Sequence, residues 1–516
     1  MYFRNSSLGG EKLGLIQSIK SLFRKGAEAI LPVQSLNSVL DHPKINLESE
    51  EYNRIIESLR YYEGKHDDIQ FKNSNGKTKK RPFSSINMMK KVAGQYATVV
   101  FNEQCEIEVD GDAKEFIENV FEHNDFKKNF AKYLEPMFAL GGLACRPYLD
   151  KKTNQIEFSW ALADAFYPLD SNSNNISECA IPFRTIRTEG GKQVYYTLLE
   201  FHEWQENGMY TITNELYRSE MPEIVGSQVN LSLLYDDLEP QSTFNTGVLS
   251  RPLFAYLKTS GFNNISPYSP LGLGVCDNCK NTLDRINRTF DEFNEEVRRG
   301  KRRIAASEML LKNRVENGQV KMYFDDDEDT FQIIPGANMD DYTIKDLTSD
   351  IRTTEYVAAI NHHLRTLEME TNLSSGTFSF DSSGKLSTKT ATEVVSENSQ
   401  TYQTRSMQIT NIEKFVKELV VTVCELGKSL NVYDGSIPSF DDVGVNFDDG
   451  AFTSTSEKLT FYQQLITLGY PVNKAFEKIL NLPEDEAMKL YQLGLRQNAD
   501  KLSGMMSNAG LPEEME

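Results

Sequence analysis

Three long segments in the middle of the chain place hydrophobic residues at helical spacing. They cover residues 277–299, about 341–370, and about 390–430. In the first segment an apolar seam of heptad type runs along an otherwise polar helix. Its members are Leu283, Ile286, Phe290, Phe293 and Val297. The third segment has the most regular pattern, formed by Ile409, Ile412, Val416, Leu419, Val423, Leu426 and Leu430. We therefore predict three rod-like helices.

The length of these helices favours an assembly of several copies. At about 1.5 Å per residue, such rods span roughly 35–60 Å. A single domain rarely needs that reach, whereas a ring or tube of side-by-side copies does. A coiled-coil dimer is the alternative. The seams are short and interrupted compared with the sustained heptads of such dimers, which weakens that alternative.

Two different segments separate the three helices. Residues 300–340 have the character of a compact β insertion, and residues 372–389 form a loop rich in Ser, Gly and Thr. Thr390, three residues before Glu393, gives a capping-box pattern at the start of the third helix. Long helices separated by a small β insertion and a loop are typical of a structural, assembly-forming protein rather than of an enzyme pocket.

The N-terminal half is predicted to be an α+β domain with a β meander. Helices are expected over residues 48–62, 85–101, 113–121 and 126–140. Strands are expected over residues 105–109, 156–158, 178–187, 193–204, 209–217 and 253–257. Turn sequences such as Glu189-Gly190-Gly191 join the strands. Residues 65–81 are predicted to be a polar loop.

Both ends of the chain are predicted to be helical. Residues 13–23 form an amphipathic pattern without a continuous apolar stretch, which favours a docking helix over a signal peptide. A loop with acids and glycines follows the third rod at residues 434–450. Short helices are then expected over residues 454–468, 473–480 and 484–495, before a frayed tail.

Composition limits the possible functions. The formal net charge of −20 argues against a protein that grips DNA phosphates with a basic face, but not against one through which DNA merely passes. The six cysteines suggest a reducing compartment without a disulfide framework. No run approaches eighteen apolar residues, so we predict no membrane span.

Motifs that could carry chemistry all favour structural interpretations. Cys276 and Cys279 lack two further zinc ligands nearby and are best explained as an incidental pair at a helix start. The segment around Lys385 lacks the glycine and hydroxyl spacing of a phosphate loop. His362 and His363 have no partner at the spacing of a metal pair. We predict no catalytic residues, no metal site and no cofactor.

One basic cluster stands out in this acidic chain. It consists of Arg298, Arg299, Lys301, Arg302 and Arg303, directly after an acidic stretch of the first rod. The cluster is short and has no interleaved aromatic residues, unlike single-strand-binding surfaces. Pairing with acidic residues between subunits is the favoured role, and DNA contact is the alternative. Candidate acidic partners are Asp325, Asp326 and Asp327.

The order of these parts resembles the portal proteins of tailed bacteriophages, in the branch found in phages of Gram-positive hosts. The residues that carry the resemblance include YYEGKH at residues 61–66 and NMMKKVAGQYATVVFNEQCEIEV at residues 87–109. Thr390-Ala391-Thr392-Glu393, with Asn398 and Tyr402, is similar to the start of the helix after the portal tunnel loop. The resemblance extends from about residue 50 to residue 500.

The resemblance implies a ring-forming portal fold with named parts. Residues 1–270 would be the wing, 271–299 and 341–371 the two stem helices, and 300–340 the clip. Residues 372–389 would be the tunnel loop, residues 390–450 a long helix with its return to the wing, and residues 451–516 a helical crown. Within the clip, strands are expected at residues 304–311, 320–324 and 331–334, pairing across subunits.

The resemblance also implies partners and a location. The ring, typically of twelve copies, would occupy one capsid vertex and conduct double-stranded DNA during packaging and ejection. It would bind the terminase large subunit, head-tail connector proteins, and the major capsid and scaffold proteins. It would lie in the virion, and in the host cytoplasm during assembly.

The tunnel loop would face the DNA through a set of small and polar residues: Ser374, Ser375, Thr377, Ser379, Asp381, Ser383 and Lys385. Its nearly balanced charge suits weak, sliding contact rather than a firm grip. Phe378 and Phe380 would anchor the loop against the rods. A structural adaptor or scaffold protein that never touches DNA is the alternative function. An enzyme using the acidic residues is less favoured still.

Overall fold

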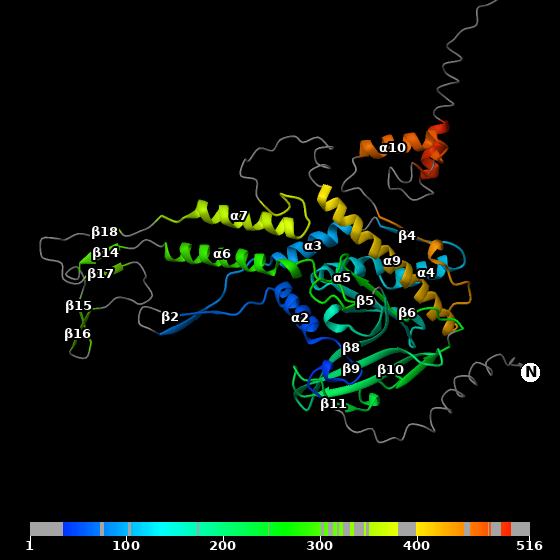
Figure 1. Cartoon of the computed structure of the whole chain (residues 1–516), viewed down its shortest axis with the longest axis horizontal. Helices are drawn as coiled ribbons and strands as arrows, with labels where there is room; N and C mark the ends of the chain where they lie inside the picture. The colour runs from blue at the N-terminus through cyan, green and yellow to red at the C-terminus, as the bar shows by residue number, and fades with distance from the viewer. Residues whose placement is uncertain are drawn as a thin grey trace, which may run out of the picture.

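The computed structural model describes residues 35–72, 77–101, 105–172, 175–245, 247–300, 350–379, 399–447, 455–472, 474–475 and 487–496, together with the backbone of short strands between residues 304 and 346. An α+β body forms one end of the molecule. The helices α6 (Lys280–Arg299) and α7 (Thr353–Glu370) project from it side by side. Short strands lie at the far end of this pair (Figure 1).

The predicted meander is present as a large antiparallel sheet. Its central strands are β8 (Ile176–Glu189), β9 (Lys192–Trp204) and β10 (Tyr210–Ser219). The strand order is β1-β11-β10-β9-β8-β7, with β12 also paired to β10. The outer strands are β1 (Ser35–Leu36), β7 (Tyr167–Ser171), β11 (Gly226–Val229) and β12 (Gln241–Phe244). The β8–β9 turn falls at Gly190-Gly191, both with positive φ, as the sequence predicted.

A second, smaller sheet lies between the meander and the helices. Its order is β13-β5-β6, formed by β13 (Ala255–Lys258), β5 (Gly142–Asp150) and β6 (Gln155–Leu162). The helices α2, α3, α4 and α5 complete the body. Their bounds are Ser49–Glu63, Met88–Val100, Ala113–His123 and Phe126–Leu140. A two-stranded pair of β4 (Glu106–Val109) and β19 (Val443–Asn446) ties the segment after the third rod to the body.

The third rod, α9 (Ser399–Ser429), is the central helix of the hydrophobic core. Its predicted seam is buried, with Ile412, Val416, Leu419 and Val423 fully inaccessible to solvent. Phe415 stacks on Phe130 of α5 at a centroid distance of 5.4 Å. The regular periodicity therefore serves packing within one subunit. The predicted start of this helix at Thr390 lies outside the described residues.

The two projecting helices differ in how closely they follow the prediction. The first agrees with it, because a 3-10 turn at Asp277–Cys279 leads directly into α6. The second begins at Thr353 rather than near residue 341. Lys345–Asp346 instead form strand β18, which pairs antiparallel with β14. Pairing with a distant strand thus overrides the local helical pattern, a common failure of pattern-based prediction.

The distal insertion contains more strands than the sequence indicated. β14 (Ile304–Ser307) pairs in parallel with β17 (Phe331–Ile334), as well as with β18. β15 (Asn313–Glu316) and β16 (Gln319–Met322) form a hairpin, of which only the second strand was predicted. All these pairs lie within one chain. Pairing across subunits remains a prediction.

The prediction of a polar loop over residues 65–81 is wrong in part. Ile69–Lys72 and Thr78–Arg81 are antiparallel strands β2 and β3, with Ile69 opposite Arg81. Their mostly solvent-exposed side chains gave no apolar signal to detect.

At the C-terminal side, α10 (Thr455–Thr467) and a helix at residues 487–496 agree with the prediction. The predicted helix at residues 13–23 and the frayed tail lie outside the described residues.

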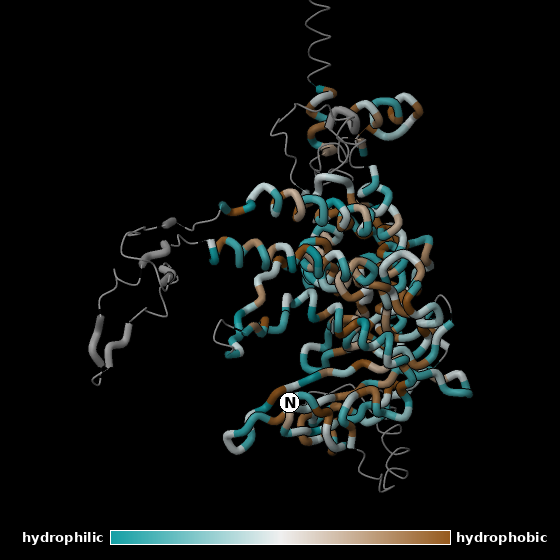
Figure 2. The backbone as a smooth tube through the Cα atoms, turned by 60° about the vertical axis from the view of Figure 1, so that its left-hand side comes forward, coloured by the Kyte–Doolittle hydropathy of each residue, from teal (hydrophilic) through white to brown (hydrophobic). Residues whose placement is uncertain are grey.

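Hydrophobic positions are concentrated in the body, whereas α6 and α7 alternate between hydrophilic and hydrophobic positions along their length (Figure 2). The seam of α6 is buried near the body, at Leu283 and Ile286, and becomes more exposed outward, reaching 45% exposure at Val297. Phe293 contacts Tyr356 of α7 at a centroid distance of 5.3 Å. The two helices therefore pack on each other through a narrow strip.

A buried ion pair ties the two sheets together. Arg146 of β5 makes a two-pronged contact with Glu200 of β9, whose other neighbour is His202, 2.7 Å away. Burial alone would raise the pKa of Glu200. The charge of Arg146 and the hydrogen bond from His202 outweigh burial and lower this pKa to about 2.

We predict that Arg146→Gln destabilises the body by about 3–5 kcal/mol at neutral pH, because it leaves the Glu200 charge buried without its partner. Since the folded pKa of Glu200 lies below its unfolded value, the stabilisation is complete above pH about 4.5 and is lost as the pH falls towards 2. The difference between wild type and variant should therefore shrink on acidification. Urea unfolding between pH 3 and 7 measures it, with the exposed Arg187→Gln as control. A constant difference across this range would contradict the prediction.

Candidate functional site

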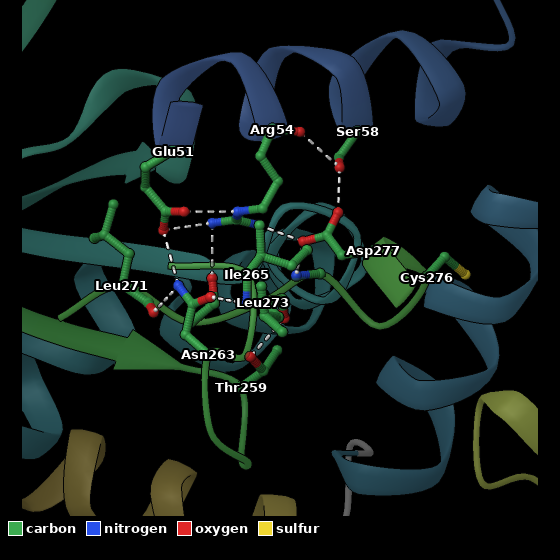
Figure 3. Close-up of polar contacts among 12 residues, drawn as sticks. Glu51, Arg54, Ser58, Thr259, Asn263, Ile265, Leu271, Leu273, Cys276 and Asp277 are labelled. Carbon is green, nitrogen blue, oxygen red and sulfur yellow. Dashed lines mark hydrogen bonds and ion pairs between the residues drawn. The ribbon is translucent and has the colours of Figure 1, made fainter. Parts of the chain in front are cut away.

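A buried group of polar side chains lies where the chain leaves the body and enters the first projecting helix (Figure 3). This helix-root cluster consists of Glu51, Arg54, Ser58, Asn263 and Asp277, each at most 6% exposed. Three of them come from α2, where a spacing of three and four residues places them on one helical face. Asp277 begins the 3-10 turn that leads into α6.

Arg54 is the centre of the helix-root cluster. Its guanidinium donates to both oxygens of Glu51, at 3.0 and 2.9 Å, and makes a short contact with Asp277. The Ser58 hydroxyl donates to the other Asp277 oxygen, and the Gly274 N–H donates to Asp277 at 2.7 Å. Helix α2 of the body is thus bonded directly to the root of α6.

The same cluster fixes the loop between β13 and α6. The Asn263 amide donates to Glu51 at 3.1 Å, and Arg54 donates to the Gly272 carbonyl at 3.1 Å. On its other side the loop lies against the end of α5, where Gly141 has φ 94° and the Gly272 backbone leaves no space for a Cβ atom. Glycine at these two positions permits the close approach of the two backbones.

The charges of the helix-root cluster are balanced. Lys280 lies 3.4 Å from Asp277 and 2.6 Å from Glu57, so two buried acids face Arg54 and a half-buried lysine. Burial alone would lower the pKa of Arg54, but its hydrogen bond to Glu51 and the charges of Asp277 and Glu51 raise it. The guanidinium therefore stays charged. A buried network of this kind is sensitive to the loss of any one member.

Further out, a second set of contacts braces α6 against the body. Arg81, at the end of β3, makes a two-pronged ion pair with Asp291, with both distances at 2.7 Å. The Ser84 N–H donates to the same carboxylate at 3.0 Å. These hydrogen bonds lower the pKa of Asp291. The hairpin β2–β3 therefore acts as a strut under α6.

The outer ends of the helix pair are joined by one more ion pair. Glu296 of α6 accepts hydrogen bonds from the Arg352 side chain and from the Arg352 backbone N–H, the latter at 2.9 Å. These bonds lower the pKa of Glu296 to about 2. The contact lies where both helices pass into the distal strands, so it holds their separation at that point.

The predicted loop residues occupy different environments. Ser374 is 2% exposed, and its hydroxyl lies 2.9 Å from that of Thr401 at the start of α9. Ser375 is exposed, whereas Thr377 and Ser379 are half-buried. In this conformation Ser374 faces the protein interior and Ser375 faces solvent. Asp381, Ser383 and Lys385 lie outside the described residues.

Phe378 packs against the main hydrophobic core, in agreement with its predicted anchoring role. Phe380 lies outside the described residues. Of the predicted basic cluster, Arg298 and Arg299 form ion pairs with Glu295 on the same helix, at 3.1 and 3.4 Å. The other members, Lys301, Arg302 and Arg303, lie outside the described residues, as do Asp325, Asp326 and Asp327.

Sequence reasoning missed the residues that position the site. Glu51, Arg54, Asp277 and Glu368 of α7 are buried, and none of them was among the predicted site residues. One signal was available, because Glu51 and Arg54 lie on the same helical face as Ile55 and Ser58. A charged pair among apolar positions of a helix indicates a buried ion pair.

Several chemical features bear on the function. Within the described residues, no group of three or more His, Cys, Asp or Glu side chains converges in a way that suits a metal ion. All six cysteines are buried free thiols, and Cys276 and Cys279 lie at the root of α6 as predicted. None of the described helices has the length and apolar character of a membrane span.

A comparison with protein families identifies the class of this chain. The family described as "Phage portal protein, SPP1 Gp6-like" matches residues 41–500. The chain belongs to this family of phage portal proteins. No curated protein matches the chain. As a portal protein, it is a component of a bacteriophage capsid vertex and serves DNA packaging. The match covers the body, the projecting helices, the loop and α9 together.

We predict that the portal protein is destabilised by about 3–5 kcal/mol when Arg54 is replaced by Met, because Glu51 and Asp277 then remain buried and unpaired. Urea unfolding followed by circular dichroism measures the loss. Arg60→Met is the matched control, since Arg60 lies on the same helix with its side chain 57% exposed. Equal stability of the two variants would contradict the role of the helix-root cluster.

Proposed function

We propose that this portal protein forms a closed ring in which the body is the wing, α6 and α7 are the stem, and the strands β14–β18 are the clip. The observation that carries the proposal is a pair of projecting helices with large apolar side chains exposed on α7. Val357 is 50% exposed and Met369 is 67% exposed on α7. A pair of isolated helices rarely presents such residues to water unless another surface covers them.

Two more exposed apolar side chains, Tyr402 and Met407, lie on α9. Sister subunits are the proposed partners, because repeated lateral contact closes a ring when the rotation between copies closes. Twelve copies is the proposed number. The crown would be formed by α10 and the helix at residues 487–496.

We further propose that double-stranded DNA passes through the ring without firm binding. A net charge of −20 repels a polyanion and limits adhesion. Arg298 and Arg299 share the carboxylate of Glu295 on the same helix, so part of their positive charge is already offset, which favours a role in protein contacts over DNA binding. ATP hydrolysis would belong to a partner, the terminase large subunit.

The remaining partners follow from the proposed place in the particle. Head-tail connector proteins, the major capsid protein and scaffold proteins would bind the ring at one vertex of the virion, after assembly in the host cytoplasm. A structural adaptor that forms a dimer or trimer is the second candidate, favoured only by the narrow apolar seam shared by α6 and α7.

Negative-stain microscopy of the purified full-length protein tests the ring directly. The proposal predicts class averages with a central pore wide enough for a DNA duplex. A dimer or trimer would support the adaptor function instead. A protein that stays monomeric at every concentration and salt condition would overturn the proposal.

We predict that Val357→Asp reduces ring formation at least tenfold, because it places a charge in an apolar contact between stem helices. His362→Asp is the matched control. It also introduces an acid at an exposed position of α7, but five residues further along, on the opposite side of the helix. Size-exclusion chromatography with light scattering measures the fraction of assembled protein. Equal loss in both variants would contradict an interface centred on Val357.

A further inference from the structure

The segment that follows α7 wraps around the carboxylate of Glu368, a residue of the last turn of that helix. One carboxylate oxygen accepts hydrogen bonds from the N–H groups of Phe378 and Ser379, at 2.5 and 2.7 Å. The other accepts from the Gly376 N–H at 3.1 Å and from the Ser379 hydroxyl at 3.0 Å. Four donors from a four-residue stretch of the loop therefore converge on one side chain.

The Glu368 carboxylate is buried, with an exposed fraction of 1%. Among the described residues, no Lys, Arg or His lies within ion-pair distance of it, so loop amides rather than a basic side chain compensate its charge. Amides held in this way form an anion-binding concavity. Hydrogen bonds to a charged acceptor are stronger than those between neutral groups. The carboxylate is thus a specific attachment point for the loop.

The backbone between α7 and this attachment point has the conformation that the contact requires. Asn372 has φ 50° and Gly376 has φ 90°, so the chain reverses direction within a few residues. At Gly376 a side chain would be strained, because L-residues rarely adopt a φ of this sign. The reversal returns Phe378 and Ser379 to the last turn of α7, where Glu368 lies.

A second set of contacts fixes the same segment to α9 and α3. The Thr404 hydroxyl donates to the Asn372 carbonyl at 2.8 Å, and the Ser374 N–H donates to the Thr401 hydroxyl at 2.9 Å. The Tyr96 hydroxyl donates to the Thr371 carbonyl. These contacts hold the first part of the loop. Residues 376–379, which follow, are held by the Glu368 carboxylate, by the packing of Phe378 and by the hydrogen bond from the Thr377 hydroxyl to the Ser374 carbonyl at 2.6 Å.

We propose that Glu368 is the positioning residue of the tunnel loop. Its carboxylate attaches residues 376–379 to the stem and thereby sets the point from which the loop extends towards the channel. This inference rests on the proposed function, in which residues 372–389 face passing DNA. Loss of the carboxylate would release residues 376–379 from the last turn of α7 and change the point from which the loop extends towards the channel.

Hydrogen exchange on the full-length protein tests the attachment without reference to DNA or to assembly. Glu368→Gln keeps the shape of the side chain but replaces an acceptor oxygen by a donor NH2 group facing N–H donors. We expect exchange of the amides of Gly376, Phe378 and Ser379 to accelerate roughly ten- to hundredfold, as for loss of hydrogen bonds to a charged group. Glu370→Gln, an exposed acid two residues away, should leave exchange unchanged.

A milder variant keeps the test decisive if Glu368→Gln does not fold. Ser379→Ala removes one of the four donors and should accelerate exchange of the neighbouring amides by a fewfold, whereas Ser375→Ala, at an exposed position, should not. Unchanged protection in the folded Glu368→Gln or Ser379→Ala protein would overturn the proposal.

In vitro DNA packaging then tests the consequence. If Glu368 positions the loop, rings of Glu368→Gln should assemble normally by negative stain but package at least several-fold less DNA than rings of Glu370→Gln. Loss of amide protection without any change in packaging would overturn the positioning role. Failure of the wild-type chain to form rings would overturn the proposed function instead. In that case the hydrogen-exchange result alone decides whether Glu368 attaches residues 376–379.

Discussion

The projecting helices depend on a rigid root, and a buried ionic network supplies it. Two helices that leave a globular body touch little besides each other, so a small rotation at the base becomes a large displacement at the tip. Arg54 restricts that rotation because its planar guanidinium bonds Glu51 within α2 and Asp277 at the start of α6. An apolar contact would also keep α2 and α6 together, but it would not fix the angle between them as closely.

Further out, a small number of ion pairs also fixes the orientation of the projecting helices. Arg81 braces the middle of α6 through Asp291, and Arg352 joins the outer end of α6 to the start of α7 through Glu296. The apolar seam between the helices is narrow, so these ion pairs determine the orientation while the seam supplies contact area.

Sequence patterns predicted the elements whose signal is local. The helices of the body, α6, α9 and the long strands of the meander follow from periodicity and from turn residues such as Gly190-Gly191. The failures have different causes. Lys345–Asp346 form a strand through pairing with the distant β14, whereas Thr78–Arg81 pair with the neighbouring β2 in a hairpin whose mostly exposed side chains give no apolar pattern. Asp277 and Glu368 gave no signal, because in a chain with 75 acidic residues a buried carboxylate looks like any other, whereas Arg54 shares a helical face with Glu51 and Ile55.

The bases of the two projecting helices and of the segment after α7 are parts of one packed region. Tyr96 of α3 hydrogen-bonds the Thr371 carbonyl, where α7 ends, and its ring lies within the core that also holds Cys276 and Cys279. Burial, followed by the proximity of these two thiols, raises the pKa of Tyr96, so the phenol stays protonated and can donate that hydrogen bond. Helix α3 thus shares one core with the start of α6 and is hydrogen-bonded to the end of α7, so both projecting helices are anchored in the same packed region.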